Sequence, residues 1–204
     1  MKRLNPSWLR SGVLVALGLS LCSGPAEAHL NSTGMGPVYD GLLHFLTSPE
    51  DLVPALALAL LAGLRGAAFG RRAAIALPVA WLAGCLSGMN ATATTGSAIL
   101  SSLWFLLLGG LVIADARISL GAMTSLAALL GLVHGYLNGT GMGPTRLAVA
   151  AALGLTAAVF VLTVLAAAVV VQLRANWARI AVRVAGSWIA AAGLLMLGWS
   201  FRGR

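Results

Sequence analysis

Six apolar segments follow one another along this 204-residue chain, and their length is the feature that most restricts its fold. They lie at approximately 52–70, 73–89, 98–115, 118–137, 145–173 and 180–200. A helix needs about 20 residues to cross roughly 30 Å of hydrocarbon. Within lipid a segment must satisfy its own backbone hydrogen bonds, so these runs are expected to be helices. The sequence therefore predicts an all-α, polytopic membrane helix bundle with about six transmembrane helices.

The small number of charged residues also indicates that the chain is surrounded by lipid. Only 9% of the residues are charged, whereas a soluble domain carries about 25%. The net charge of +8 does not indicate a nucleic-acid-binding protein, because the arginines stand at the ends of apolar runs rather than on one basic face. We expect the lipid bilayer as the main partner and no nucleic acid.

The first 28 residues have the features of a secretory signal peptide. Lys2 and Arg3 precede the apolar stretch "SGVLVALGLSLCSG", and "AEA" ends at Ala28. Small residues of this kind precede a signal peptidase site. Cleavage after Ala28 would leave His29 as the first residue. A lipid-modified Cys22 and an uncleaved first helix are the alternatives.

The expected organisation is a signal peptide at 1–28, an exported or interfacial segment at 29–51 and a six-helix transmembrane domain at 52–204. If the mature amino terminus is exported, one set of arginines is cytoplasmic: Arg65, Arg71, Arg72, Arg117, Arg174, Arg179 and Arg183. Arg146, Arg202 and Arg204 would lie outside. This excess agrees with the positive-inside rule. We expect a multi-pass protein of a bacterial-type inner (plasma) membrane.

A polar heptapeptide occurs twice in this hydrophobic chain, with one substitution between the copies. "NSTGMGP" begins at Asn31, "NGTGMGP" begins at Asn138, and each copy follows a histidine closely. Glycine permits positive φ and proline suits a first helical turn, so each copy is expected to break the chain and start a helix. Asn31, Asn138, Met35 and Met142 could support a bound ion. Ordinary helix capping is the alternative.

The segment before the first span carries the acidic residues of the exported side. Asp40 and His44 are four apart and share one face if the segment is helical. A carboxylate at that distance from an imidazole suits a metal site or a proton relay. Glu50 and Asp51 stand in "SPED", which reads as a helix start. Ser48 would be the cap, Asp51 would close a capping-box-like pair, and both acids would compensate the helix dipole.

The three histidines complete a candidate metal site at the outer face. His134 lies near the outer end of the fourth span, where a polar side chain is expensive and usually faces the bundle interior. A ring hydrogen-bonded to a neighbouring carbonyl is the alternative role. His29, if it is the new terminus, offers both its α-amine and its ring. The expected metal ligands are therefore His29, His44, His134, Asp40, Glu50 and Asp51.

This nitrogen and oxygen ligand set suits Ni, Co, Zn or Cu(II) better than Cu(I). We expect a divalent transition metal as a possible substrate and no organic cofactor. No nucleotide-binding motif occurs in the sequence, so any transport would be passive, ion-coupled or driven by a partner.

At these residues the chain resembles the HupE/UreJ family of membrane proteins, which is associated with hydrogenase and urease maturation. The resemblance rests on His29 after "AEA", "GLLH" and "ED" before the first span, "HGYLNG" in the fourth and "RVAGSWIAAAGLLML" near the end. It implies a nickel or cobalt permease, or an accessory protein that supports metallocentre assembly, with a metalloenzyme-maturation protein as possible partner.

The family motifs are matched with substitutions. The first motif has a histidine followed six and seven residues on by Asp-His; here His44 matches, and Glu50 and Asp51 stand for that pair. The later motif, His-Gly-x-Ala-His-Gly, is matched by His134 and Gly135, while Asn138 replaces the second histidine. A harder, oxygen-rich set holds nickel less tightly or prefers another divalent ion.

The leading hypothesis is thus a divalent metal permease, or a metal-handling accessory protein, rather than an enzyme. The second hypothesis is a non-transporting membrane scaffold that docks a partner. A membrane-embedded metal-dependent hydrolase ranks third, because neither Gly-x-Ser-x-Gly nor His-Glu-x-x-His occurs in the sequence.

Overall fold

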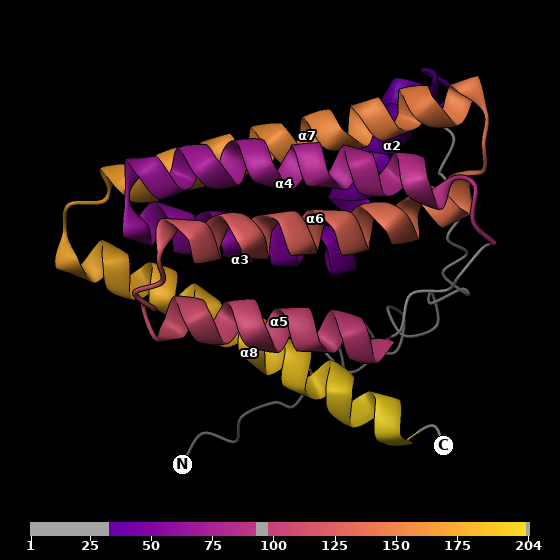
Figure 1. Ribbon diagram of the computed structural model, residues 1–204. Helices are drawn as coiled ribbons and strands as arrows, with labels where there is room; N and C mark the ends of the chain where they lie inside the picture. Colours follow the sequence, from indigo (N-terminus) through magenta and orange to yellow (C-terminus); the bar gives the residue numbers. More distant parts are fainter. Residues whose placement is uncertain (1–32, 93–97, 203–204) are drawn as a thin grey trace, which may run out of the picture.

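The protein is an all-helical bundle, as the sequence predicts (Figure 1). The computed structural model describes residues 33–92 and 98–202, so the expected signal peptide lies outside the described residues. The described helices are α2 (Pro37–Thr47), α3 (Pro49–Arg65), α4 (Ala67–Gly88), α5 (Ala98–Ile113), α6 (Leu120–Met142), α7 (Arg146–Gln172) and α8 (Asn176–Arg202).

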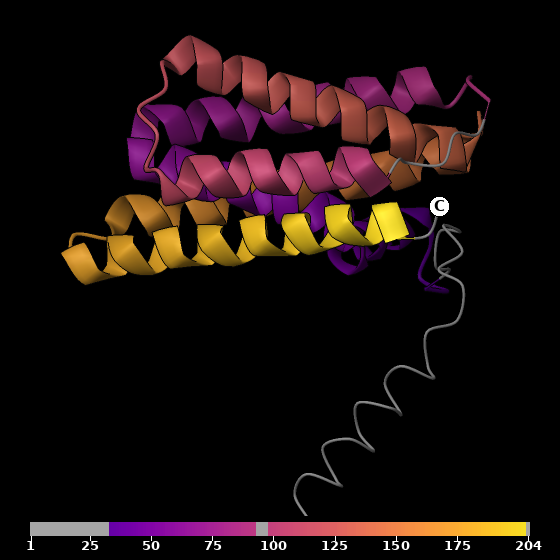
Figure 2. The ribbon, with the colours of Figure 1, turned by 90° about the horizontal axis from the view of Figure 1, so that it is seen from below.

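The axes of helices α3 to α8 are roughly aligned, although the chain direction alternates between some of them. The helix α5 lies beside α8 as a pair at one side of the bundle (Figures 1 and 2). The other main pair is α4 with α6, and α7 packs on α2, α3 and α4. The core therefore sits between α3, α4, α6 and α7, where Leu58, Trp81, Leu130 and Leu155 are fully or almost fully buried.

The number of membrane spans depends on how two elements are counted. Within the described residues, α4, α6, α7 and α8 are each long and apolar enough to cross a membrane. The helices α2 and α3 meet at a 74° bend and qualify only as a pair, as a broken span or a re-entrant loop. The helix α5 has 16 residues, fewer than the usual 20 or so. Each of the six expected runs does contain a helix.

The first helix boundary differs from the sequence prediction. A span was expected over 52–70, but α3 ends at Arg65 and α4 begins at Ala67. The single residue between them, Gly66, has φ 110° and ψ 176°. Only glycine adopts this backbone region readily, so one residue reverses the chain inside a continuous apolar run.

We expect Gly66→Ala to lower stability by about 1–3 kcal/mol through backbone strain alone. A Cβ at this position meets no atom within 4 Å, so steric clash does not contribute. Thermal unfolding in detergent measures the loss. Gly110→Ala is the matched control, because its surroundings are equally open and its helical backbone accepts alanine. Equal unfolding temperatures for the two variants would contradict the assignment of strain to Gly66.

The pair α4 and α6 packs backbone to backbone. Glycines on both helices face the partner's main chain at increasing residue numbers on each, so the two helices run parallel: Gly84, Gly88, Gly131, Gly135 and Gly139. In lipid, small residues allow helices this close approach and the dispersion contacts that come with it. The glycines in these two spans therefore allow close packing of their helices.

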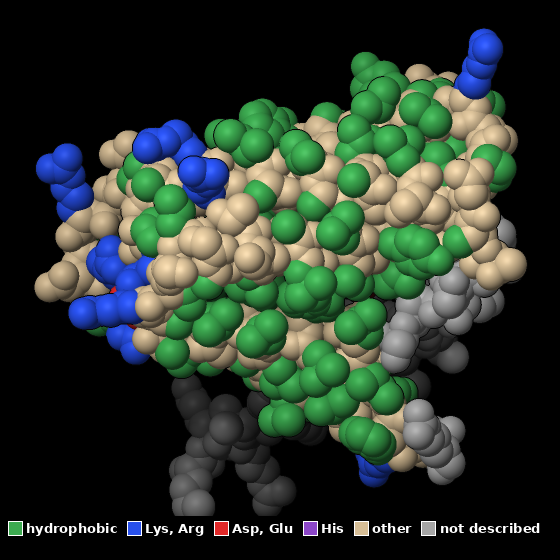
Figure 3. Space-filling view, in the orientation of Figure 1, with side chains coloured by type: hydrophobic (Ala, Val, Ile, Leu, Met, Phe, Trp, Pro, Cys, Tyr) green, Lys and Arg blue, Asp and Glu red, His purple; other side chains and the backbone are tan. Residues whose placement is uncertain are grey.

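One end of the bundle is rich in arginine (Figure 3). These arginines lie near helix ends or in the turns between helices: Arg65, Arg71, Arg72, Arg117, Arg174, Arg179 and Arg183. Asp115, in the turn after α5, pairs with Arg65 and with Arg179, the latter at 3.4 Å. Arg183 Nε donates to the carbonyl of Ile113 at 2.7 Å. These contacts join α3, α5 and α8 at this end.

Candidate functional site

Asp51 is a buried carboxylate in the first turn of α3, with 4% of its surface exposed. The sequence prediction that it closes a capping pair with Ser48 is wrong, because no side-chain hydrogen bond caps this helix. Asp51 instead accepts two hydrogen bonds from α6. The helix start predicted at "SPED" is confirmed, because α3 begins at Pro49. The proline and the exposed Glu50 account for the local helix start, and Asp51 serves a tertiary contact.

His134 faces the bundle interior from α6 and is 3% exposed. Its Nδ1 lies 2.8 Å from Oδ1 of Asp51. An ionised carboxylate only accepts hydrogen bonds, so we assign the ring proton to Nδ1. The alternative role expected for this ring was a bond to a neighbouring carbonyl. Its Nδ1 bonds the carboxylate of Asp51 instead. The bond fixes the orientation of the imidazole and leaves Nε2 without that proton in the neutral ring.

Asn138 and His44 extend this pair into a chain of four side chains. Asn138 lies one turn after His134, and its Nδ2 donates to Oδ2 of Asp51 at 2.9 Å and to the carbonyl of His134 at 2.8 Å. Its Oδ1 lies 2.9 Å from Nε2 of His44 on α2, so Nε2 of that ring is the donor. His44 is half-buried. We name the set His44, Asn138, Asp51 and His134 the outer polar chain.

The second nitrogen of His134 points among aromatic rings. Among the described residues its Nε2 is buried without a hydrogen-bond partner, as are the indole nitrogens of Trp81 and Trp104. The imidazole centroid lies 5.5 Å from that of Trp81 and 6.1 Å from that of Trp104. A buried polar atom with no partner normally indicates strain, an absent water or a ligand. The structure thus leaves Nε2 of His134 unpaired among the described residues, with two indole rings beside the imidazole.

The other expected site residues do not join this chain. Oδ1 of Asp40 accepts from the backbone N–H and the hydroxyl of Thr33, at 2.5 and 2.7 Å. Glu50 and Met35 are exposed. Met142 packs against the hydrophobic core. His29 and Asn31 lie outside the described residues.

The two heptapeptide copies fold differently. In the first, Gly34 and Gly36 have positive φ and Pro37 begins α2, as expected. In the second, α6 continues through Asn138 as far as Met142, and only Gly143 breaks the helix. Continuation of α6 places Asn138 one turn after His134, on the same face. The repeat in sequence therefore does not produce a repeat in structure.

The metal-binding capacity of the described residues is limited. No group of three or more His, Cys, Asp or Glu side chains within 33–92 and 98–202 could hold a metal ion. His134 offers one free nitrogen, and Asp51 is occupied by two donors. Within those residues the chain brings together two expected ligands, His134 and Asp51, and links His44 to them only through an amide.

Two kinds of residue were missed from the sequence: the two tryptophans beside the site and Asp115 at the arginine-rich end of the bundle. Trp81 and Trp104 flank His134, but nothing in their local patterns distinguishes them from core tryptophans. Asp115 could have been found, because the whole chain has five acidic residues and this one stands beside Arg117. An isolated carboxylate in an arginine-rich turn indicates an ion pair.

Comparison with known families gives one match. The model of the HupE / UreJ protein family matches residues 17–196. No curated protein and no solved structure matches the chain. The family match covers most of the 204 residues and includes all of the outer polar chain. Together with the buried Asp51–His134 pair and the multi-pass helical bundle, it shows that this chain belongs to the HupE/UreJ family.

Proposed function

We propose that this protein handles a divalent transition metal of the nickel and cobalt class, as a permease or as a metal-handling accessory protein. The family is regarded as one of transporters rather than enzymes. In the proposal, His134 is the residue that contacts the ion and Asp51 is its positioning partner. His44 on α2 is linked to this pair through Asn138.

The free Nε2 of His134 is the observation that carries the proposal. Histidines that bind metals almost always donate their other ring N–H to a carboxylate or carbonyl, which fixes the tautomer and raises the basicity of the ligand. The bond from Nδ1 of His134 to Asp51 has this arrangement. An imidazole oriented in this way, with its Nε2 left unpaired, suits nickel, cobalt, zinc or copper.

The scarcity of further ligands favours passage over storage. An ion held by one imidazole keeps much of its water shell or takes ligands from mobile groups. Conduction requires binding strong enough for entry and weak enough for release. A site with one well-oriented nitrogen meets that requirement better than a closed cage of four ligands.

We further propose that the arginine-rich end is cytoplasmic and that the outer polar chain lies toward the exported side. The positive-inside rule supports this orientation. Arg65, Arg71 and Arg179 mark the cytoplasmic end. Asp51 lies in the first turn of α3 and His134 in the second half of α6, both toward the end of the bundle opposite these arginines. An ion arriving from outside would therefore meet His44 before His134.

The proposal predicts that purified protein in liposomes carries Ni, Co, Zn or Cu(II) across the membrane, and that His134→Ala reduces the flux at least about tenfold. Ion-sensitive dyes inside the vesicles measure it under several ion gradients. Glu50→Gln is the matched control, because it alters an exposed acid one residue from Asp51, and its flux should equal that of the wild type. His134→Gln, with the wild-type unfolding temperature, separates loss of function from loss of fold.

Wild-type flux equal to that of empty vesicles under every gradient would remove the permease. A second candidate, an accessory protein that does not transport, is favoured by the lack of a three-ligand cluster among the described residues. It predicts unchanged metal uptake in cells carrying His44→Ala and His134→Ala, but weaker recovery of a maturation partner on the purified protein.

A further inference from the structure

Two grooves flank the first turns of α4 at the arginine-rich end. One, of about 270 Å³, lies between α4 and α7. The other, of about 580 Å³, lies between α4 and α6. Arg71 lines both grooves, and Arg72 lines the second. We call them the α4–α7 groove and the α4–α6 groove.

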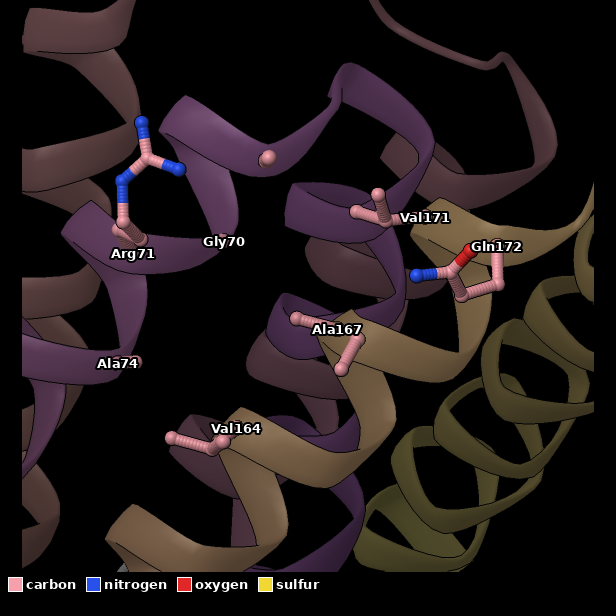
Figure 4. A pocket seen from close by; sticks show the side chains of 9 residues that line it. Gly70, Arg71, Ala74, Val164, Ala167, Val171 and Gln172 are labelled. Carbon is pink, nitrogen blue, oxygen red and sulfur yellow. The ribbon is translucent and has the colours of Figure 1, made fainter.

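The α4–α7 groove has an apolar floor and a polar rim. Gly70, Ala74 and Ala167 form the buried floor, and small side chains keep it hollow. Figure 4 shows Arg71 and Ala74 on α4 facing Val164 and Ala167 on α7 across the groove. Because the bundle stands in a bilayer, such a hollow on its apolar surface is filled by hydrocarbon.

The α4–α6 groove has the same character on the other side of α4. Ile75 and Ala76 of α4 and Leu120 of α6 supply apolar lining, and Arg72 also lines it. Two apolar grooves thus begin on either side of one basic position. A lipid with two acyl chains and one phosphate has the matching shape.

Arg71 and Arg72 lack partners in the described part of the chain. Both side chains are exposed, and neither forms an ion pair or a hydrogen bond there. At the same end, Arg65 and Arg179 are paired with Asp115, and Arg183 with a carbonyl. Two adjacent free guanidinium groups at the membrane surface attract anionic head groups, and each can donate two parallel hydrogen bonds to a phosphate.

We propose that α4 is the binding site of one anionic diacyl phospholipid at the arginine-rich end. Its phosphate lies against Arg71 and Arg72, one acyl chain occupies the α4–α7 groove, and the other occupies the α4–α6 groove. This site is separate from the outer polar chain and does not depend on what the protein transports.

Native mass spectrometry of the full-length protein in detergent tests the proposal. With phosphatidylglycerol and phosphatidylcholine of identical acyl chains, we expect preferential retention of one phosphatidylglycerol. Arg71→Gln and Arg72→Gln should each weaken that retention about fivefold. Arg117→Gln is the control, since it removes a positive charge at the same end but lines neither groove. It should leave retention unchanged.

Two further arms test the acyl chains and the source of the phosphate. Ala168→Phe, at the exposed rim of the α4–α7 groove, should weaken retention of the lipid by filling the groove. Soluble glycerol phosphate should not displace the lipid. Equal retention of the two head groups, an equal effect of Arg117→Gln, no effect of Ala168→Phe, or displacement by glycerol phosphate would each overturn the proposal.

Discussion

Asp51→Ala is expected to destabilise the protein more than any other single change of a side chain in the outer polar chain. The carboxylate accepts from Nδ1 of His134 and from Nδ2 of Asn138. Removing it leaves Nδ1 of His134 without this acceptor in the interior, at about 1–3 kcal/mol for an orphaned buried group, whereas the half-buried Nδ2 of Asn138 keeps its bond to the carbonyl of His134. Asp51→Asn should cost less, because its amide oxygen still accepts one bond. Chemical unfolding in detergent measures both losses.

The same substitution tests the positioning role of Asp51. Without the carboxylate the His134 ring loses the partner that fixes its tautomer, so metal flux should fall about 10–100-fold. In Asp51→Asn the fold is better preserved, and a loss of flux there reports on the imidazole rather than on unfolding. Glu50→Gln is again the control. Full flux in Asp51→Asn would mean that the carboxylate has only a structural role.

Gly135→Ala is expected to break the closest contact between α4 and α6. A Cβ at Gly135 would overlap the carbonyl oxygen of Trp81 and lie 2.9 Å from its carbonyl carbon. These are main-chain atoms of a helix, so neither partner can turn aside as a flexible side chain would. Forcing the helices apart should cost about 1–3 kcal/mol. It should also move Trp81 away from His134 and change the fluorescence of that indole.

Gly141→Ala provides the control for this prediction. Gly141 lies on the same helix, and a Cβ there meets no atom within 4 Å. Alanine should be neutral or stabilise α6 by as much as about 1 kcal/mol, the usual difference in helix propensity. If Gly135→Ala and Gly141→Ala unfolded at the same temperature, the glycine contact would not hold the two helices together.

The helical elements could be predicted because apolar length alone determines them in a membrane protein. The boundary at Gly66 could not, since a glycine in an apolar run is as common inside a span as at a turn. The bend between α2 and α3 was also hidden, because Ser48 and Pro49 indicate a helix start without giving its direction.

The candidate site was predictable by residue type but not by partnership. His44, His134 and Asp51 could be identified because ionisable side chains are rare in such an apolar chain, and the few that occur usually have a structural or functional role. Local sequence explained Asp51 as a capping residue, and only the approach of α6 shows that its partner is 83 positions away. Asn138 seemed to begin a loop, whereas the continued helix places its amide beside His134.

The amide of Asn138 has a consequence for proton movement. Its oxygen only accepts and its nitrogen only donates, so it holds His44 and Asp51 together without passing a proton between them. A histidine, which the related motif has at this place, could take a proton on one nitrogen and release another. In this chain the amide therefore interrupts the route. A proton that arrives at His44 is not passed along it to His134.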